Sequence, residues 1–138
     1  MITFVRIALL LLISAPALAQ RPIDFAPLNW PEDGAIVIPV VAGDTLTGLA
    51  AELDERTGGA LSMAAAEAKF TGEARQTLTM FGIKPWSRID LIGVGNEPVT
   101  RVVAEDFGGL AAGLNDGSSG TRVAILWSGV EREDDATA

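Results

Sequence analysis

The sequence predicts a single α/β domain in which helices flank a mixed, mostly parallel sheet. One observation is the continuous apolar, β-branched run from Ala35 to Val41, which is typical of a buried strand. Another is the order of the patterns that follow it: two helices, two strands, a long helix and a last strand. The composition agrees, because a chain of 138 residues that is 49% hydrophobic and 20% charged has room for one globular domain.

The composition also limits the chemistry. The sequence contains neither cysteine nor histidine, which excludes disulfides, thiolate metal sites and the general base of most hydrolases. The formal net charge of −8 argues against electrostatic binding of nucleic acid.

Residues 1–19 have the layout of a secretory signal peptide. Arg6 precedes an apolar run from Ile7 to Ile13, and small residues at Ala17 and Ala19 favour cleavage after Ala19. The run is shorter than the ~20 residues that a membrane span needs. We therefore expect a periplasmic or secreted protein with no stable membrane anchor after cleavage.

A proline-rich segment, residues 20–34, follows the signal peptide. Its three prolines forbid a regular helix. We expect an extended arm whose apolar side chains pack on the domain, the alternative being a loose linker. These side chains are Phe25, Leu28 and Trp30.

The strand Ala35–Val41 contains Pro39, which favours an edge position or a bulge. Asp44 is a plausible N-cap for a helix from Thr45 to Arg56, which Gly58 and Gly59 end. The alanine-rich stretch from Ala60 to Lys69 predicts a second, short helix.

Two strands and the longest helix come next. Alternation predicts a half-exposed strand over Arg75–Phe81, and an apolar run predicts another over Arg88–Val94. Pro98 lies near the expected start of the helix, whose apolar spacing continues to Leu114.

A last strand is predicted over Arg122–Trp127, and the connection to it through the long helix should be a right-handed crossover. Residues 131–138 have the composition of an acidic tail.

Three segments together resemble the N-terminal domain of the leucyl aminopeptidase family, the two-metal cytosol aminopeptidases. They are Leu53-Asp54 followed by Gly58-Gly59-Ala60-Leu61, then Phe70-Thr71-Gly72 followed by Gln76-Thr77-Leu78, then Leu91-Ile92-Gly93-Val94-Gly95. Their order and spacing match the family over about residues 35–128, so we place the domain at residues 35–130.

The resemblance implies a three-layer fold similar to macro domains. In the family this domain precedes a larger domain that holds two divalent metals and the active site, and members are typically hexamers. The catalytic signature and the metal ligands of that larger domain are absent from this sequence. The resemblance therefore assigns no catalytic, metal-binding or cofactor-binding residue here.

Two sets of residues remain as candidates for binding. Gly93, Gly95 and Asn96 lie between a strand and a helix, where backbone amides can hold an anion. A plain tight turn is the favoured explanation, because the full dinucleotide motif is missing and Glu97 puts a negative charge where the anion would lie. Trp86 and Trp30 are candidates for contact with a partner, since aromatic residues anchor interfaces. The alternative is that Trp86 covers the edge of the sheet.

These features predict an exported, non-catalytic domain that acts in assembly, regulation or partner binding. The partner would be a metallo-aminopeptidase chain or another copy of this chain. Two alternatives stay open. One is a macro-like module that binds a nucleotide or another small anion. The other is the front part of a periplasmic metallo-aminopeptidase.

Overall fold

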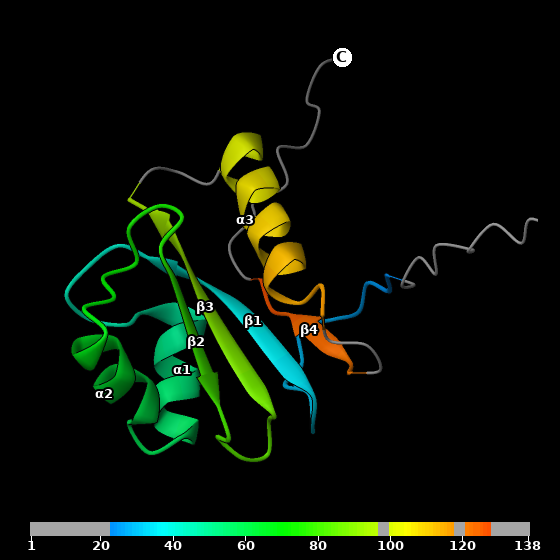
Figure 1. Ribbon diagram of the computed structural model, residues 1–138, viewed down its shortest axis with the longest axis horizontal. Helices are drawn as coiled ribbons and strands as arrows, with labels where there is room; N and C mark the ends of the chain where they lie inside the picture. Colours follow the sequence, from blue (N-terminus) through cyan, green and yellow to red (C-terminus); the bar gives the residue numbers. More distant parts are fainter. Residues whose placement is uncertain (1–22, 97–99, 118–120, 128–138) are drawn as a thin grey trace, which may run out of the picture.

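The computed structural model describes residues 23–96, 100–117 and 121–127 (Figure 1). The predicted signal peptide, Pro98 and the acidic tail lie outside the described residues. In chain order the elements are β1 (Ala35–Val41), α1 (Gly48–Arg56), α2 (Ala60–Glu67), β2 (Thr77–Phe81), β3 (Arg88–Gly95), α3 (Arg101–Leu114) and β4 (Val123–Ile125). None of the helices in this part of the chain has the length and apolar character needed to cross a membrane.

The strands form one mixed sheet with the order β2-β3-β1-β4. β1 runs parallel to β3 and β4, and β2 runs antiparallel to β3. Helices α1 and α2 cover one face of the sheet and α3 covers the other (Figure 1). The predicted three-layer α/β fold with a mostly parallel sheet is confirmed.

The two long connections cross the sheet in opposite directions. The chain passes from β1 to the β2–β3 side by way of α1 and α2, and from β3 back to β4 by way of α3. Because the two sets of helices lie on opposite faces, both crossovers have the same handedness.

β1 is an interior strand despite Pro39, so the expectation of an edge strand is wrong. The carbonyl of Val37 accepts a hydrogen bond from the amide of Leu126 at 3.0 Å, which directs the odd-numbered residues of this stretch toward β4. The next bond of this parallel ladder would need an N–H on Pro39, and the pairing of β4 with β1 ends just before it, at Val37 and Ile125. The register with β3 shifts shortly afterwards, between Val40 and Val41.

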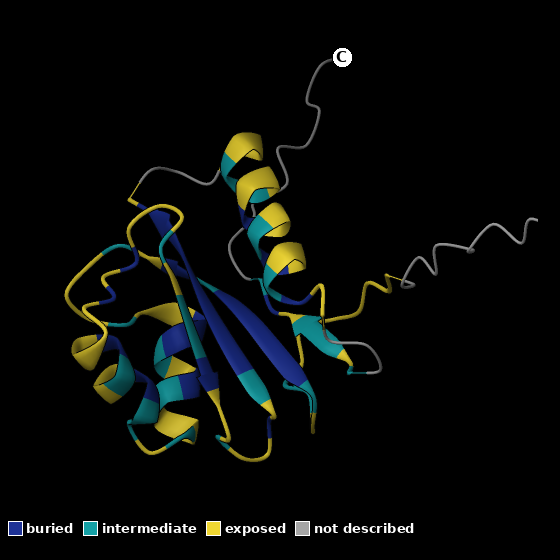
Figure 2. Ribbon diagram, viewed as in Figure 1, coloured by how far each residue is buried: buried dark blue, intermediate teal, exposed yellow. Residues whose placement is uncertain are grey.

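The sheet separates two apolar cores (Figure 2). The larger cluster lies between the sheet and α1–α2 and includes the fully buried Ile36, Leu53 and Leu61. The smaller cluster lies between the sheet and α3 and contains Ile92 and Phe107. Burial of these apolar side chains is what holds the helices on the sheet.

Local backbone conformation moves several boundaries from their predicted positions. α1 begins at Gly48, not Thr45, because the left-handed φ of +58° at Gly48 breaks any earlier helical path. Thr47, not Asp44, therefore occupies the N-cap position. β2 begins at Thr77 because Arg75 has a φ of +68°.

Helix α3 begins with a side-chain cap. The hydroxyl of Thr100 accepts a hydrogen bond from the amide of Val103 at 3.3 Å. This bond satisfies one of the free donors of the first turn, which explains why the helix begins at Arg101.

Candidate functional site

The loop predicted to bind an anion follows the carboxyl end of β3. The amide of Gly93 donates to the carbonyl of Gln76 at 2.7 Å, and the amide of Gly95 donates to the carbonyl of Gly72 at 3.0 Å. Both donors are therefore used within the chain. Asn96 is exposed, but the two glycine amides do not form the expected anion cradle.

Close packing of the backbone explains the glycine at position 93. A Cβ atom there would collide with the carbonyl oxygen of Glu73 and with the backbone of Gly72. At position 95 the requirement is conformational, since φ is +76°. Through these glycines the segment before β2 packs closely against the end of β3. This agrees with the explanation that the glycines form a plain tight turn.

A shallow hollow lies beside this loop, between Gly93 and the first turns of α3. The guanidinium of Arg75 and the carboxylate of Asp106 line it, 3.5 Å apart, and both side chains are largely exposed. Its volume of about 40 Å³ is far below the ~300 Å³ of the smallest common ligand pockets. A nucleotide does not fit in it.

Trp86 is buried, with only 5% of its surface exposed, so its predicted role as an exposed contact residue is wrong. Its indole Nε1 donates to the carbonyl of Pro31 at 2.8 Å, and its ring lies 6.2 Å from that of Trp30. The loop before β3 folds inward and places Trp86 in the larger core. Trp86 therefore contacts the end of the arm, at Pro31 and Trp30, from within the larger core.

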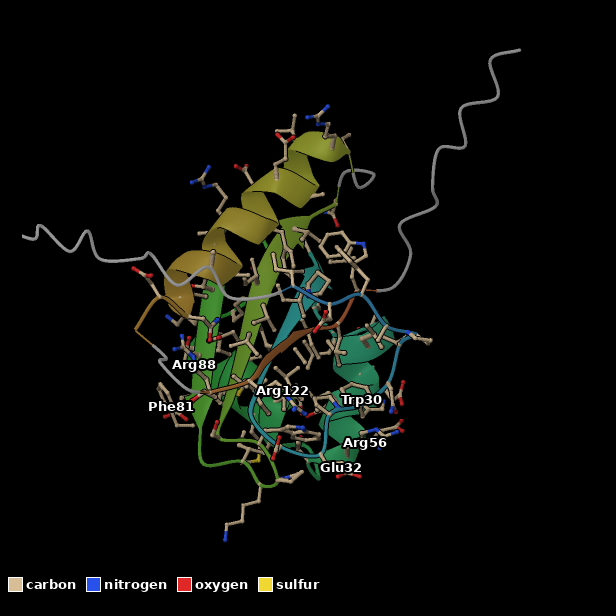
Figure 3. All side chains as sticks on the ribbon, turned by 90° about the vertical axis from the view of Figure 1, so that its right-hand side faces the viewer. Trp30, Glu32, Arg56, Phe81, Arg88 and Arg122 are labelled. Carbon is tan, nitrogen blue, oxygen red and sulfur yellow. The ribbon has the colours of Figure 1, made fainter. Side chains whose placement is uncertain are left out.

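Trp30 fastens the arm to α1 (Figure 3). Its Nε1 donates to Oε1 of Glu52 at 2.7 Å, and the same oxygen accepts from Nη2 of Arg56 at 3.0 Å. The guanidinium carbon of Arg56 lies 4.9 Å from the centroid of the Trp30 ring. The hydrogen bond from Arg56, followed by that from Trp30, holds the pKa of Glu52 below its ordinary range.

The arm before Trp30 does not pack as predicted. The exposed fractions are 80% at Ile23, 97% at Phe25 and 56% at Leu28. The expectation that the apolar side chains of the arm cover the domain is therefore right for Trp30 and wrong for Phe25 and Leu28. The apolar side chains of Ile23, Phe25 and Leu28 are therefore exposed to solvent.

A buried polar cluster, which the sequence analysis did not predict, links β2, β3 and α3. The carboxylate of Asp90 is fully buried and accepts hydrogen bonds from Thr79 Oγ1 at 2.6 Å, Arg88 Nε at 3.0 Å and Asn115 Nδ2 at 3.2 Å. The signal was present, because Asp90 is a lone carboxylate inside an apolar strand. Its oxygens accept from three donors of the chain itself, so the cluster links β2, β3 and the end of α3 and stabilises their packing.

The residues that the structure describes include no group of three or more acidic side chains placed to hold a metal ion.

Comparison with known proteins identifies a family and similar solved structures. The model of the cytosol aminopeptidase family, N-terminal domain, matches residues 37–138. A solved structure of a lysine-to-glutamate mutant of tomato leucine aminopeptidase is similar, with a TM-score of 0.59 and 25% sequence identity. That similarity covers 79% of this chain but only 23% of the tomato chain. No curated protein matches the sequence.

Proposed function

Because the chain belongs to the cytosol aminopeptidase family through its N-terminal domain, we propose that it acts as an exported, non-catalytic domain that binds a protein partner. The proposed partner is a metallo-aminopeptidase chain. A domain of this type would frame or regulate the active site that such a partner supplies.

The extent of the match carries the proposal. The family model that matches is that of the N-terminal domain, and the structural similarity spans 23% of the tomato enzyme. The match does not include the larger domain that holds the metals and the active site in this family. These observations favour an accessory role over independent catalysis.

The same partial coverage supports a second candidate, in which the sequence is the front part of a longer periplasmic aminopeptidase. The small-ligand alternative has less support. The amides of Gly93 and Gly95 are used internally, and the neighbouring hollow measures about 40 Å³.

An activity assay tests the non-catalytic part of the proposal. The purified chain is incubated with a leucyl amide substrate and Mn²⁺ or Zn²⁺, metals that support this class of hydrolysis. We expect no turnover above a metal-only blank. Turnover that copurifies with the chain and disappears on chelation would overturn the proposal.

A pull-down tests the partner. The tagged chain serves as bait in a periplasmic extract of the source organism, and mass spectrometry identifies what it retains. We expect a metallo-aminopeptidase chain to be enriched over an untagged control. Recovery of no peptidase removes the support for this partner, and peptides of one longer polypeptide that contains this sequence establish the second candidate.

A further inference from the structure

We propose that two copies of the chain associate by exchanging their arms, residues 23–26 of each copy adding a short strand to the free edge of β4 in the other. This inference is independent of the peptidase partner, because it concerns contacts between identical chains. It rests on two features of the structure: an exposed apolar arm and an unpaired strand edge that matches it.

The arm offers a short stretch of backbone suited to strand pairing. Residues 23–26 lie between Pro22 and Pro27, so all four have the N–H donors that the prolines lack. Pro27 also favours an extended conformation at the residue before it. In an extended chain Ile23 and Phe25 point to one side, and their exposures of 80% and 97% show that their own chain hardly contacts them.

The edge of β4 offers the complementary groups. In the part of the chain that the structure describes, β4 is the last strand of the sheet on its side. The carbonyl of Arg122 accepts from Ala35 and the amide of Leu126 donates to Val37, so the even-numbered residues of this stretch face β1. The N–H and C=O groups of Val123 and Ile125 are therefore directed outward, and the Ile125 side chain is 51% exposed.

The side chains of the arm and of β4 also alternate compatibly. When Ile23 and Phe25 lie on the same side of the pair as Val123 and Ile125, Asp24 falls on the side of Arg122. The apolar residues then meet apolar residues, and the carboxylate meets a guanidinium.

Charge favours the same pairing. No lysine or arginine lies between Arg21 and Arg56, so the charged residues of the arm after Arg21 are all acidic. On the β4 edge the exposed Arg122, directly before the strand, supplies a cation (Figure 3). An exposed arginine beside the half-exposed Ile125 suits an acidic, apolar segment.

Among the described residues no hydrogen bond joins the arm before Trp30 to β4 of its own chain. Trp30 is held on α1 by Glu52, on the opposite side of the sheet from α3. Residues 23–29 extend from this anchor and, at ~3.3 Å per residue, reach on the order of 20 Å. A reciprocal exchange between two copies makes the contact twice, which strengthens a short pairing.

Sedimentation equilibrium of the full chain, as recovered from the cells that express it, tests the proposal. We expect a monomer–dimer equilibrium. Phe25→Ala should raise the dimer Kd by about tenfold or more, because each dimer loses two buried rings. Val102→Ala is the matched control, since Val102 is 65% exposed on α3, away from the arm and β4, and this change should leave the Kd unaltered.

A charge exchange tests the register. Asp24→Arg and Arg122→Glu should each weaken the dimer, and the double variant should recover it. A monomer at every concentration, a dimer indifferent to Phe25→Ala, or a double variant weaker than both single variants would overturn the arm exchange. None of these outcomes alters the pull-down result, so the two proposals fail separately.

Discussion

At the scale of single residues, Gly93 is the described glycine at which an added Cβ atom would come closest to neighbouring backbone. We expect Gly93→Ala to lower the free energy of unfolding by about 2–4 kcal/mol, because the new methyl group meets the Glu73 carbonyl and fixed backbone. The measurement is urea unfolding followed by circular dichroism.

Gly108→Ala is the matched control. Gly108 lies in α3 and is exposed, and among the described residues beyond its own helix backbone no atom comes within 4 Å of the place an added methyl group would take. Alanine there should stabilise the helix by up to about 1 kcal/mol. Equal effects of the two substitutions would show that helix propensity and not close packing governs position 93.

Asp90 should be the most sensitive carboxylate of the described part. Asp90→Ala removes the acceptor of three buried or half-buried donors, and we expect a loss of about 3–5 kcal/mol in the free energy of unfolding. Asp106→Ala is the control, because its ion pair with Arg75 is exposed and contributes at most ~1 kcal/mol. Similar losses for both variants would contradict the structural role of the buried cluster.

Individual side chains were the least predictable part of the protein. Trp86 lies on a loop with Pro85, which indicates exposure, yet the loop folds under the arm and buries the ring. The burial depends on Pro31 and Trp30, more than fifty positions away in the sequence. Contacts over such separations leave no periodic signal in the sequence.

At the scale of secondary-structure elements, the sequence predicts the order and type of every helix and strand that the structure describes, while the ends shift by a few residues. Apolar periodicity depends on burial, which extends over a whole element. The ends depend on single backbone angles, such as the left-handed φ of Gly48 and Arg75. The position of the strand that contains Pro39 is equally hard to predict, because it depends on which strands pair with β1 and where that pairing ends.

The contact between the arm and α1 should depend on pH. The pKa of Glu52 is depressed in the folded chain, so its contribution to stability is present above the ordinary carboxyl pKa of 4.5 and is lost as the pH falls through the lower folded value. We expect Glu52→Gln to lower the urea midpoint at pH 7, and to have less effect as the pH falls through the depressed folded pKa and the native carboxylate is also neutralised.

Glu55→Gln, an exposed position on the same helix, serves as the control and should leave the midpoint unchanged at pH 7 and at low pH. A Glu52→Gln effect of equal size at pH 7 and at low pH would show that the carboxylate charge does not hold Trp30.

At the scale of the whole molecule, the three-layer fold follows from the order of the patterns, and three short segments were enough to indicate the family. The site was less accessible, because the glycines that suggested an anion loop serve the packing of backbone on backbone. Gly-x-Gly between a strand and a helix has the same appearance in both cases.

Processing of the chain remains a prediction at this scale. We expect mass spectrometry of protein recovered from the periplasm to give a chain that begins at Gln20, as cleavage after Ala19 requires. A chain that retains Met1 and stays in the cytoplasm would contradict the predicted export.

The unequal cores on the two faces of the sheet have a consequence for motion. Helix α3 rests on the smaller apolar cluster, whereas β1 and β3 are also held by the larger cluster beneath α1 and α2. Segments with fewer buried apolar contacts open more readily without global unfolding. Amide hydrogen exchange should therefore be faster in α3 than in β1 and β3, with uniform protection as the contrary result. The face covered by α3 would then open locally more often than the face covered by α1 and α2.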